Sequence, residues 1–248
     1  MCGACFGRRA FLTGAVATVG SGMAGCDRIS LVPDAKVEEM GLRAWREISA
    51  ATPLSDNAGW QDALSATATR LLRTAGKAPG DWEVAVFASP EVNAFALPGG
   101  KIGVYEGMFR TIGSEDQLAA IVGHEIGHID AAHAKERMEV EAARGAGIRL
   151  VAWLLNAGNV EYADEIAAAL GVGVQYGLVL PYSRRQELEA DRLGLIAMAE
   201  ADYDPEEAVD LWRRMEAAAG RRPFEILATH PAPQSRIEAI EAMLPEIT

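Results

Sequence analysis

Residues 119–130 read Ala-Ala-Ile-Val-Gly-His-Glu-Ile-Gly-His-Ile-Asp and contain the pattern His-Glu-x-x-His. In a helix, His124 and His128 lie one turn apart on the same face, about 6 Å from each other. Two imidazoles at this spacing can bind one metal ion, each nitrogen at about 2.0–2.1 Å. Glu125 is rotated by roughly 100° about the helix axis, so it contacts a water molecule on the metal rather than acting as an equivalent ligand. The stretch therefore predicts two metal ligands and a general base for hydrolysis.

The residues around the motif predict that this helix is buried. An apolar stripe is formed by Leu118, Ile121, Val122, Ile126 and Ile129. Two histidines and a glutamate are costly in a buried helix unless a partner satisfies them, which favours a metal site over a solvated histidine pair. Gly123 and Gly127 lower the helix propensity, so we expect another element to pack closely against this helix.

Length and composition indicate one globular domain behind a short leader. The chain has 248 residues, of which 50% are hydrophobic and 23% are charged, as in ordinary globular proteins. The net charge of −12 and the lack of a Lys/Arg cluster argue against a nucleic-acid partner. We expect a signal segment at residues 1–25, a short tether at 26–33 and a single domain at 34–248.

Residues 1–25 have the layout of a bacterial export signal. Arg8-Arg9 precedes a modestly apolar, Gly/Ala-rich run without acidic residues, which is typical of twin-arginine signals. The run ends in Met23-Ala-Gly-Cys26, which resembles a lipoprotein processing site. We therefore expect export across the inner membrane and a lipid on Cys26 that anchors the protein facing the periplasm. Asp27 favours the inner membrane slightly over the outer membrane.

All three cysteines, Cys2, Cys5 and Cys26, fall in or directly after this signal segment. The domain that follows therefore needs no disulfide and offers no thiolate metal ligand. We interpret Cys2 and Cys5 as lost with the signal. The alternative, a metal-binding or redox C-x-x-C site, lacks a second cysteine pair.

The remaining sequence predicts a mainly α-helical fold with a small antiparallel β-sheet, an α+β domain. Helices are expected at 34–51, 57–75 and 114–142, from about 181, and from about 234 to 244. Strands are expected at 82–87, 92–97 and 101–105, the last two joined by a hairpin turn at Pro98-Gly99-Gly100. The apolar runs 148–155 and 166–180 are shorter than the roughly 18 residues of a membrane span, so we interpret them as core or surface-docking helices. The sequence does not decide whether these runs contact a membrane.

A catalytic zinc ion usually takes three protein ligands and keeps one position for water. His133 falls on a different face of the predicted helix from His128, and we expect it at the exposed surface. Glu187 and Asp191 share one face of a later helix, so one can bind the metal while the other holds the free nitrogen of a ligand histidine. Periodicity alone does not choose between Glu187 and Glu189.

Several motifs, in this order, resemble the M48 family of zinc metallopeptidases, which are gluzincins. They are Asn93-Ala-Phe-Ala-x-Pro-Gly-Gly-x-Ile102, His124-Glu125-x-x-His128, Glu187-x-x-x-Asp191 and His230-Pro231 followed by Ser235-Arg236-Ile237. The resemblance covers roughly residues 80–240, which makes it far more specific than the pentapeptide alone. It implies a gluzincin-type metallopeptidase domain, of the lipoprotein or periplasmic type without a multi-span membrane region.

The resemblance also implies the composition of the site. One zinc ion per chain would be bound by His124, His128 and Glu187. Glu125 would be the general base, and Asp191 would orient one of the ligand histidines.

Further residues are implied around this centre. The substrate backbone would add as a strand beside Asn93, Ala94, Phe95 and Ala96. His230, together with Arg236, would lie beside the metal, where His230 steadies the oxyanion or caps the zinc ion in a latent state. The alternative for His230 is a buried loop histidine without such a role.

The sequence thus predicts a zinc-dependent endopeptidase that acts on polypeptides, which we expect to be misfolded or unassembled envelope proteins. The alternative is a lipid-anchored periplasmic chaperone or assembly factor whose zinc site is latent or structural. The intact Glu125 favours the enzyme, because a structural site has no use for a base beside its ligands.

Overall fold

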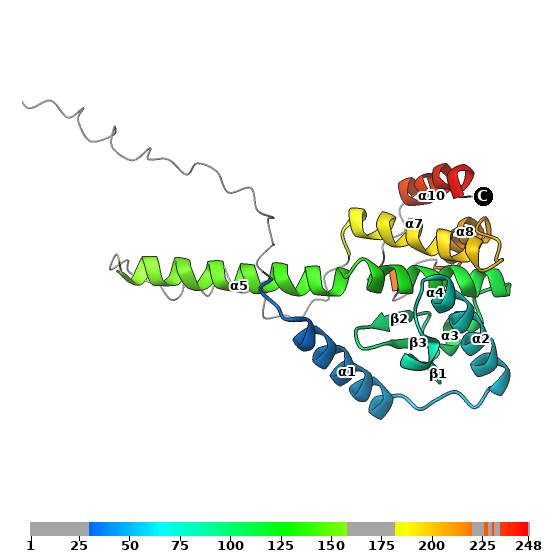
Figure 1. Cartoon of the computed structure of the whole chain (residues 1–248), viewed down its shortest axis with the longest axis horizontal. Helices are drawn as coiled ribbons and strands as arrows, with labels where there is room; N and C mark the ends of the chain where they lie inside the picture. Colours follow the sequence, from blue (N-terminus) through cyan, green and yellow to red (C-terminus); the bar gives the residue numbers. More distant parts are fainter. Residues whose placement is uncertain (1–29, 158–181, 220–225, 228–229, 231–233, 248) are drawn as a thin grey trace, which may run out of the picture. The chain divides into compact units, whose positions relative to one another are not determined.

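The helix that carries the His-Glu-x-x-His motif, α4 (Glu115–Asp130), forms the centre of the fold. Its N-cap Ser114 accepts a hydrogen bond from the backbone N–H of Gln117, which satisfies a free donor of the first turn. Every residue from Gln117 to His128 is buried. The small sheet packs against α4, and so do α7 (Arg184–Glu200) and α8 (Glu207–Ala219), as Figure 1 shows.

The computed structural model describes residues 30–157, 182–219, 226–227, 230 and 234–247. The predicted signal 1–25, Cys26 and the apolar run 166–180 lie outside these residues. The remaining described helices are α1 (Asp34–Ala51), α2 (Ala58–Thr74), α3 (Glu106–Phe109), α5 (His133–Ala157), α10 (Gln234–Ile247) and the 3₁₀ helix η1 (Pro79–Asp81). The prediction of a mainly helical domain with a small sheet is confirmed. None of the helices in the described ranges is long and apolar enough to cross a membrane.

The prediction of one helix over 114–142 was wrong, because the chain breaks between α4 and α5. Ala132 has a φ of 54°, a left-handed conformation that an α-helix cannot contain. The chain turns there and begins α5 at His133, so the face of His133 does not follow from the periodicity of α4. The apolar run 148–155 lies within α5.

The sheet has the strand order β1 (Glu83–Phe87), β3 (Lys101–Tyr105), β2 (Ala94–Leu97). The predicted hairpin is confirmed, since β2 and β3 pair antiparallel around Gly99 and Gly100, whose φ values are 88° and 70°. The expectation of a purely antiparallel sheet was wrong, because β1 pairs with β3 in parallel. The connection from β1 carries the chain past β3 to its other edge, and this leaves β2 as an edge strand near α4.

Glycines allow α4 and α7 to approach each other closely, as the sequence predicted. A Cβ atom on Gly127 would lie 2.6 Å from the carbonyl oxygen of Ala190 in α7. A Cβ atom on Gly194 would lie 2.8 Å from the backbone nitrogen of His124. Both distances are shorter than any normal contact, so larger residues would push the helices apart. This close packing positions the first turn of α7 beside the motif histidines.

We expect Gly127→Ala to lower the free energy of unfolding by about 1–3 kcal/mol, as measured by urea denaturation. Overpacking against Ala190 outweighs the gain of about 1 kcal/mol that alanine brings to a helix. The control is Gly59→Ala in α2, where a Cβ atom would meet Asn57 Oδ1 at 3.4 Å, an ordinary contact. That variant should be as stable as the wild type or slightly more stable. A Gly127→Ala protein of unchanged stability would contradict the close contact.

Candidate metal centre

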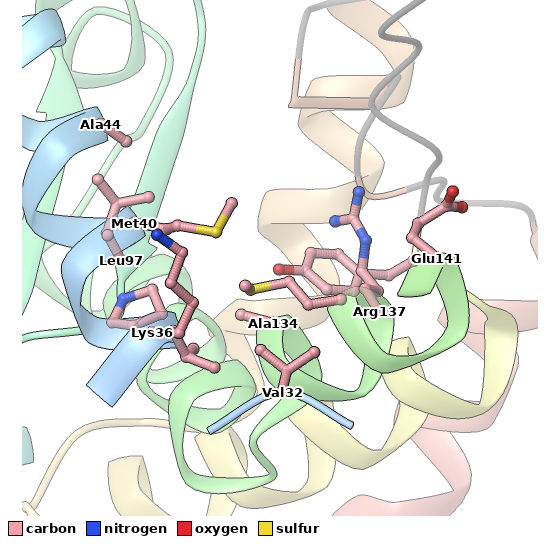
Figure 2. A pocket seen from close by; sticks show the side chains of 13 residues that line it. Val32, Lys36, Met40, Ala44, Leu97, Ala134, Arg137 and Glu141 are labelled. Atoms are coloured by element: carbon pink, nitrogen blue, oxygen red, sulfur yellow. The ribbon is translucent and has the colours of Figure 1, made fainter. Parts of the chain in front are cut away.

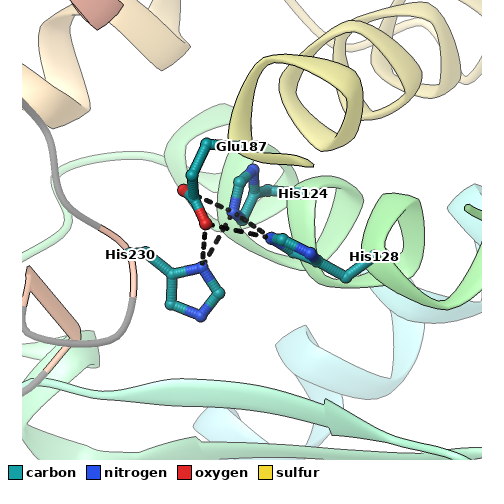
Figure 3. A group of neighbouring side chains, drawn as sticks. All are labelled: His124, His128, Glu187 and His230. Atoms are coloured by element: carbon teal, nitrogen blue, oxygen red, sulfur yellow. Dashed lines mark hydrogen bonds and ion pairs between the residues drawn. The ribbon is translucent and has the colours of Figure 1, made fainter. Parts of the chain in front are cut away.

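Four buried side chains from three parts of the chain converge beside α4 (Figure 3). His124 and His128 come from α4, Glu187 from the first turn of α7, and His230 from the segment that precedes α10. One nitrogen or oxygen atom of each lies within 4.8 Å of the corresponding atoms of the others. The structure therefore brings together the three residues that the resemblance implied as ligands, with His230 beside them, as the resemblance also implied.

The distances between these atoms fit a tetrahedral metal ion. Nε2 of His124 lies 3.0 Å from Nε2 of His128 and 3.2 Å from Nδ1 of His230. Oε1 of Glu187 lies 3.1 Å from Nδ1 of His230 and 3.5 Å from Nε2 of His128. Four donors at about 2.0–2.1 Å from a tetrahedral zinc ion are about 3.3 Å apart. The four side chains thus occupy positions that a single ion of this size can link.

Asp191 holds His124 in the orientation that a ligand needs. Its Oδ1 lies 2.9 Å from Nδ1 of His124. A carboxylate at this nitrogen keeps the imidazole proton on Nδ1, so that the lone pair of Nε2 points into the cluster. Asp191 is fixed in turn by Arg236, which donates from Nε and Nη2 at 2.7 Å each.

His133 holds His128 in a similar way, and the expectation that it is exposed was wrong. It is only 1% exposed, and its Nδ1 lies 2.9 Å from Nδ1 of His128. Burial lowers the pKa of His133, so at neutral pH its uncharged ring can accept the Nδ1 proton of His128. Its other nitrogen, Nε2, lies 3.4 Å from Oε2 of Glu189. Glu189 therefore lies one contact farther from the cluster than Glu187.

The sequence offered no signal for His133, because its contact with His128 exists only through the break at Ala132. Neither glycine nor proline marks the break, which falls within Asp130-Ala-Ala-His133. A continuous helix would place His133 on a different face from His128.

The charges in the cluster suit a cation. Burial alone would raise the pKa of Glu187, but hydrogen bonds with His128 and His230, helped by the charge of Arg236, hold that pKa well below its usual range. Burial also lowers the pKa of His128 to about 3, so its imidazole is neutral at pH 7. An ionised carboxylate with a neutral imidazole is the protonation state in which these groups bind metals.

Arg236 is a buried cation that faces two carboxylates of the site, Glu187 and Asp191. It is 1% exposed, its Nη1 lies 2.5 Å from Oε2 of Glu187, and its Nη2 lies 2.7 Å from Oδ1 of Asp191. Burial alone would raise the pKa of Asp191, but the charge of Arg236 lowers it. The ring of Trp212 lies 4.2 Å from the guanidinium carbon. Arg236 thus stabilises the ionised carboxylates without being one of the four converging groups.

Glu125 points away from the ligand face of α4 and towards the edge of the sheet. Its Oε2 accepts a hydrogen bond of 3.1 Å from the backbone N–H of Ala96. Its buried Oε1 has no hydrogen-bond partner among the residues that the structure describes, and Nε2 of His230 lies 3.6 Å away. A buried carboxylate oxygen without a hydrogen bond costs free energy, because it has lost its contact with water. This indicates that a water molecule or a substrate atom binds there.

The predicted substrate strand, Asn93 to Ala96, lies where such a partner would approach. In the described part of the chain, β2 pairs only with β3. The side chain of Ala94 is buried in the core, and the ring of Phe95 packs 6.2 Å from that of Trp45. The backbone of β2 is therefore the part that faces Glu125, through the N–H of Ala96.

This fold and cluster define a class of protein. Residues 60–244 match the model of peptidase family M48, and the chain belongs to this family. The match begins within α2 and includes every residue of the cluster, whereas α1 precedes it.

Among individual proteins, the chain is similar to metalloendopeptidases of mitochondria and to a bacterial protease. It is 36% identical over 185 residues to the mitochondrial metalloendopeptidase OMA1 of Schizosaccharomyces pombe, covering 74% of this chain and 52% of that protein. It is 28% identical over 208 residues to the beta-barrel assembly-enhancing protease of Escherichia coli, covering 80% of this chain and 42% of that protein. The chain spans about half the length of these relatives.

Proposed function

We propose that this protein is a zinc-dependent endopeptidase whose metal is bound by His124, His128 and Glu187. The observation that supports the proposal most strongly is the convergence of these side chains beside a buried glutamate, Glu125, whose Oε1 has no hydrogen-bond partner in the described ranges. Membership of peptidase family M48 supports it. Zinc in this site would lower the pKa of a water molecule and polarise the scissile carbonyl.

Glu125 is the general base in this proposal. The N–H of Ala96 holds Oε2, so that Oε1 is the atom that accepts the proton of the attacking water. Glu125 then passes this proton to the leaving amine. The substrate lies as an extended strand beside β2, which places its backbone next to Glu125.

His230 and Arg236 complete the charge pattern of the site. Burial acts to lower the pKa of His230, but the carboxylates of Glu125 and Glu187 outweigh it and raise that pKa. An N–H group of His230 would donate a hydrogen bond to the oxyanion that develops on the substrate. Arg236 keeps Glu187 and Asp191 ionised and fixed.

The physiological substrates in this proposal are misfolded or unassembled proteins of the bacterial envelope. The twin-arginine pattern at Arg8-Arg9 and the processing motif before Cys26 support export and a lipid anchor that faces the periplasm, with the inner membrane favoured by Asp27. The similarity to the beta-barrel assembly-enhancing protease of Escherichia coli supports an envelope role.

Removal of the metal tests the proposal. We expect the full chain to cleave a fluorescent casein substrate, to lose this activity with a zinc chelator, and to recover it when about one equivalent of zinc is added. The measurement is the cleavage rate together with the zinc content by elemental analysis. Cleavage that is indifferent to chelation in a protein free of metal would contradict the proposal.

A second function is favoured by one observation. Nδ1 of His230 lies 3.2 Å from Nε2 of His124 and 3.1 Å from Oε1 of Glu187, where it could occupy the fourth coordination position of the metal. A catalytic zinc ion keeps that position for water. A site capped in this way suits a chaperone or assembly factor with a latent zinc ion. Zinc bound at one ion per chain, without cleavage of casein or of unfolded envelope proteins, would favour this second function.

A further inference from the structure

An apolar groove lies between α1 and the first turns of α5 (Figure 2). It has a volume of about 610 Å³. Its walls are mainly apolar and include Val37, Met40, Leu97, Ala134, Met138 and Tyr182. In Figure 2, Met40 and Ala44 extend from α1 on one side, while Ala134 and Arg137 lie on α5 across from them. Side-chain pockets that take apolar ligand groups have this character.

The groove lies close to His128 of the metal centre. A second cavity of about 320 Å³ is lined by His128, and it shares Val37, Pro98 and Ala134 with the groove. Tyr182 links the two places as well, because it lines the groove while its ring stacks on that of His128, 4.0 Å away. The guanidinium carbon of Arg137 lies 4.5 Å from the centre of the Tyr182 ring.

The wall formed by α1 is fixed against the sheet. The ring of Trp45 packs 5.3 Å from that of Phe87. A Cβ atom on Gly41 would lie only 2.1 Å from the carbonyl oxygen of Pro98, so α1 touches the β2–β3 turn directly. The groove is therefore bounded by packed elements, and its α1 wall lies outside the residues that match the family model.

We propose that this groove binds one large apolar side chain of the polypeptide substrate, next to the bond that is cleaved. The inference rests on the proposed peptidase function. A substrate strand beside β2 passes Glu125 at Ala96, and the next residues of β2 and its turn, Leu97 and Pro98, line the groove. Because a strand advances about 3.3 Å per residue, the side chain that enters lies within a residue or two of the scissile bond.

The expected size of the effect follows from burial. Moving a leucine side chain from water into such a groove favours binding by about tenfold to 100-fold over a residue that leaves the groove empty. The protein should therefore prefer leucine, methionine or phenylalanine over alanine at one fixed position relative to the cleaved bond. Mass spectrometry of a digested peptide mixture identifies that position.

The test compares two peptides that differ only by leucine or alanine at that position. The full zinc-loaded chain should show a kcat/KM ratio of at least about ten in favour of leucine. Ala44→Phe, which fills the groove from α1, should reduce the ratio below about three. The matched control is Ala50→Phe, an exposed site on the same helix, which should keep the wild-type ratio. Met138→Ala, which widens the opposite wall, should shift the preference towards phenylalanine.

Binding provides a measurement that does not depend on turnover. In the Glu125→Gln background, a fluorescent leucine peptide should bind at least about tenfold more tightly than its alanine partner, and Ala44→Phe should remove this difference. An unchanged ratio in Ala44→Phe would overturn the assignment. An equal loss for both peptides would leave the ratio unchanged, and would overturn the assignment as well. If no peptide is cleaved, the peptidase proposal fails, while binding of a peptide with several leucines, compared with its all-alanine counterpart, still decides whether the groove selects apolar side chains.

Discussion

Glu125→Gln is expected to retain zinc and to lose cleavage, with kcat lower by about 10²- to 10⁴-fold. Glutamine preserves the shape of the side chain, and its amide oxygen can still accept the hydrogen bond from Ala96 N–H. It cannot take a proton from water, so the step that needs a base is lost. Peptide cleavage rates measure the loss, and elemental analysis measures the retained zinc.

The control for this variant is Glu115→Gln, the same chemical change at an exposed position of α4. It should have wild-type activity and zinc content. A fully active Glu125→Gln protein would contradict the role of Glu125. Loss of zinc in that variant would instead assign Glu125 to metal binding.

Arg236→Met is expected to destabilise the metal-free protein by about 3–5 kcal/mol, as measured by urea unfolding. The change leaves Glu187 and Asp191 buried without the cation that both face. Bound zinc would compensate part of the negative charge of the two carboxylates, so the loss of stability should be smaller in the zinc-loaded protein. A variant that is equally destabilised in both forms would contradict this electrostatic explanation.

Arg213→Met provides the matched control. Arg213 forms ion pairs with Asp210 and Glu241, but its side chain is 56% exposed. Exposed ion pairs contribute about 0–1 kcal/mol, because water and salt screen them. If Arg213→Met lowered the free energy of unfolding as much as Arg236→Met, burial of the arginine would not be the cause of the destabilisation.

Much of the fold follows from local patterns in the sequence. The helix over 34–51 has the predicted bounds, because an apolar face and the following Pro53 define it without help from the rest of the chain. The hairpin turn follows from glycines at the two positions with positive φ. The contact of α4 with α7 was signalled by Gly123 and Gly127, whose absent side chains leave room for another backbone.

Two features that depend on tertiary structure were not predicted. The helix break at Ala132 lies among residues that favour a helix or tolerate one, so local propensity gives no warning. The parallel pairing of β1 depends on which edge of β3 the chain reaches, and strand patterns do not encode that choice. Both features bear on function, because the first brings His133 to His128 and the second leaves β2 at the edge.

The residues of the metal centre also fall into those that the sequence could predict and those that it could not. Two residues one helical turn apart, His124 and His128, can be predicted to converge from spacing alone. The choice of Glu187 over Glu189 came from the resemblance to the M48 family, and the structure places Glu187 in the cluster and Glu189 beyond His133. The resemblance also implied Arg236 beside the metal, but its hydrogen bonds from α10 to Asp191 of α7 link residues too far apart in the chain for periodicity to predict them.

Zinc K-edge X-ray absorption on the full chain tests the central claim most directly. We expect about one zinc ion per chain with nitrogen and oxygen ligands only, at about 2.0–2.1 Å, including imidazole. A sulfur ligand at about 2.3 Å would instead place the metal on one or more of the three cysteines, Cys2, Cys5 and Cys26. That result, or a zinc content far below one ion per chain, would contradict a metal held between α4 and α7.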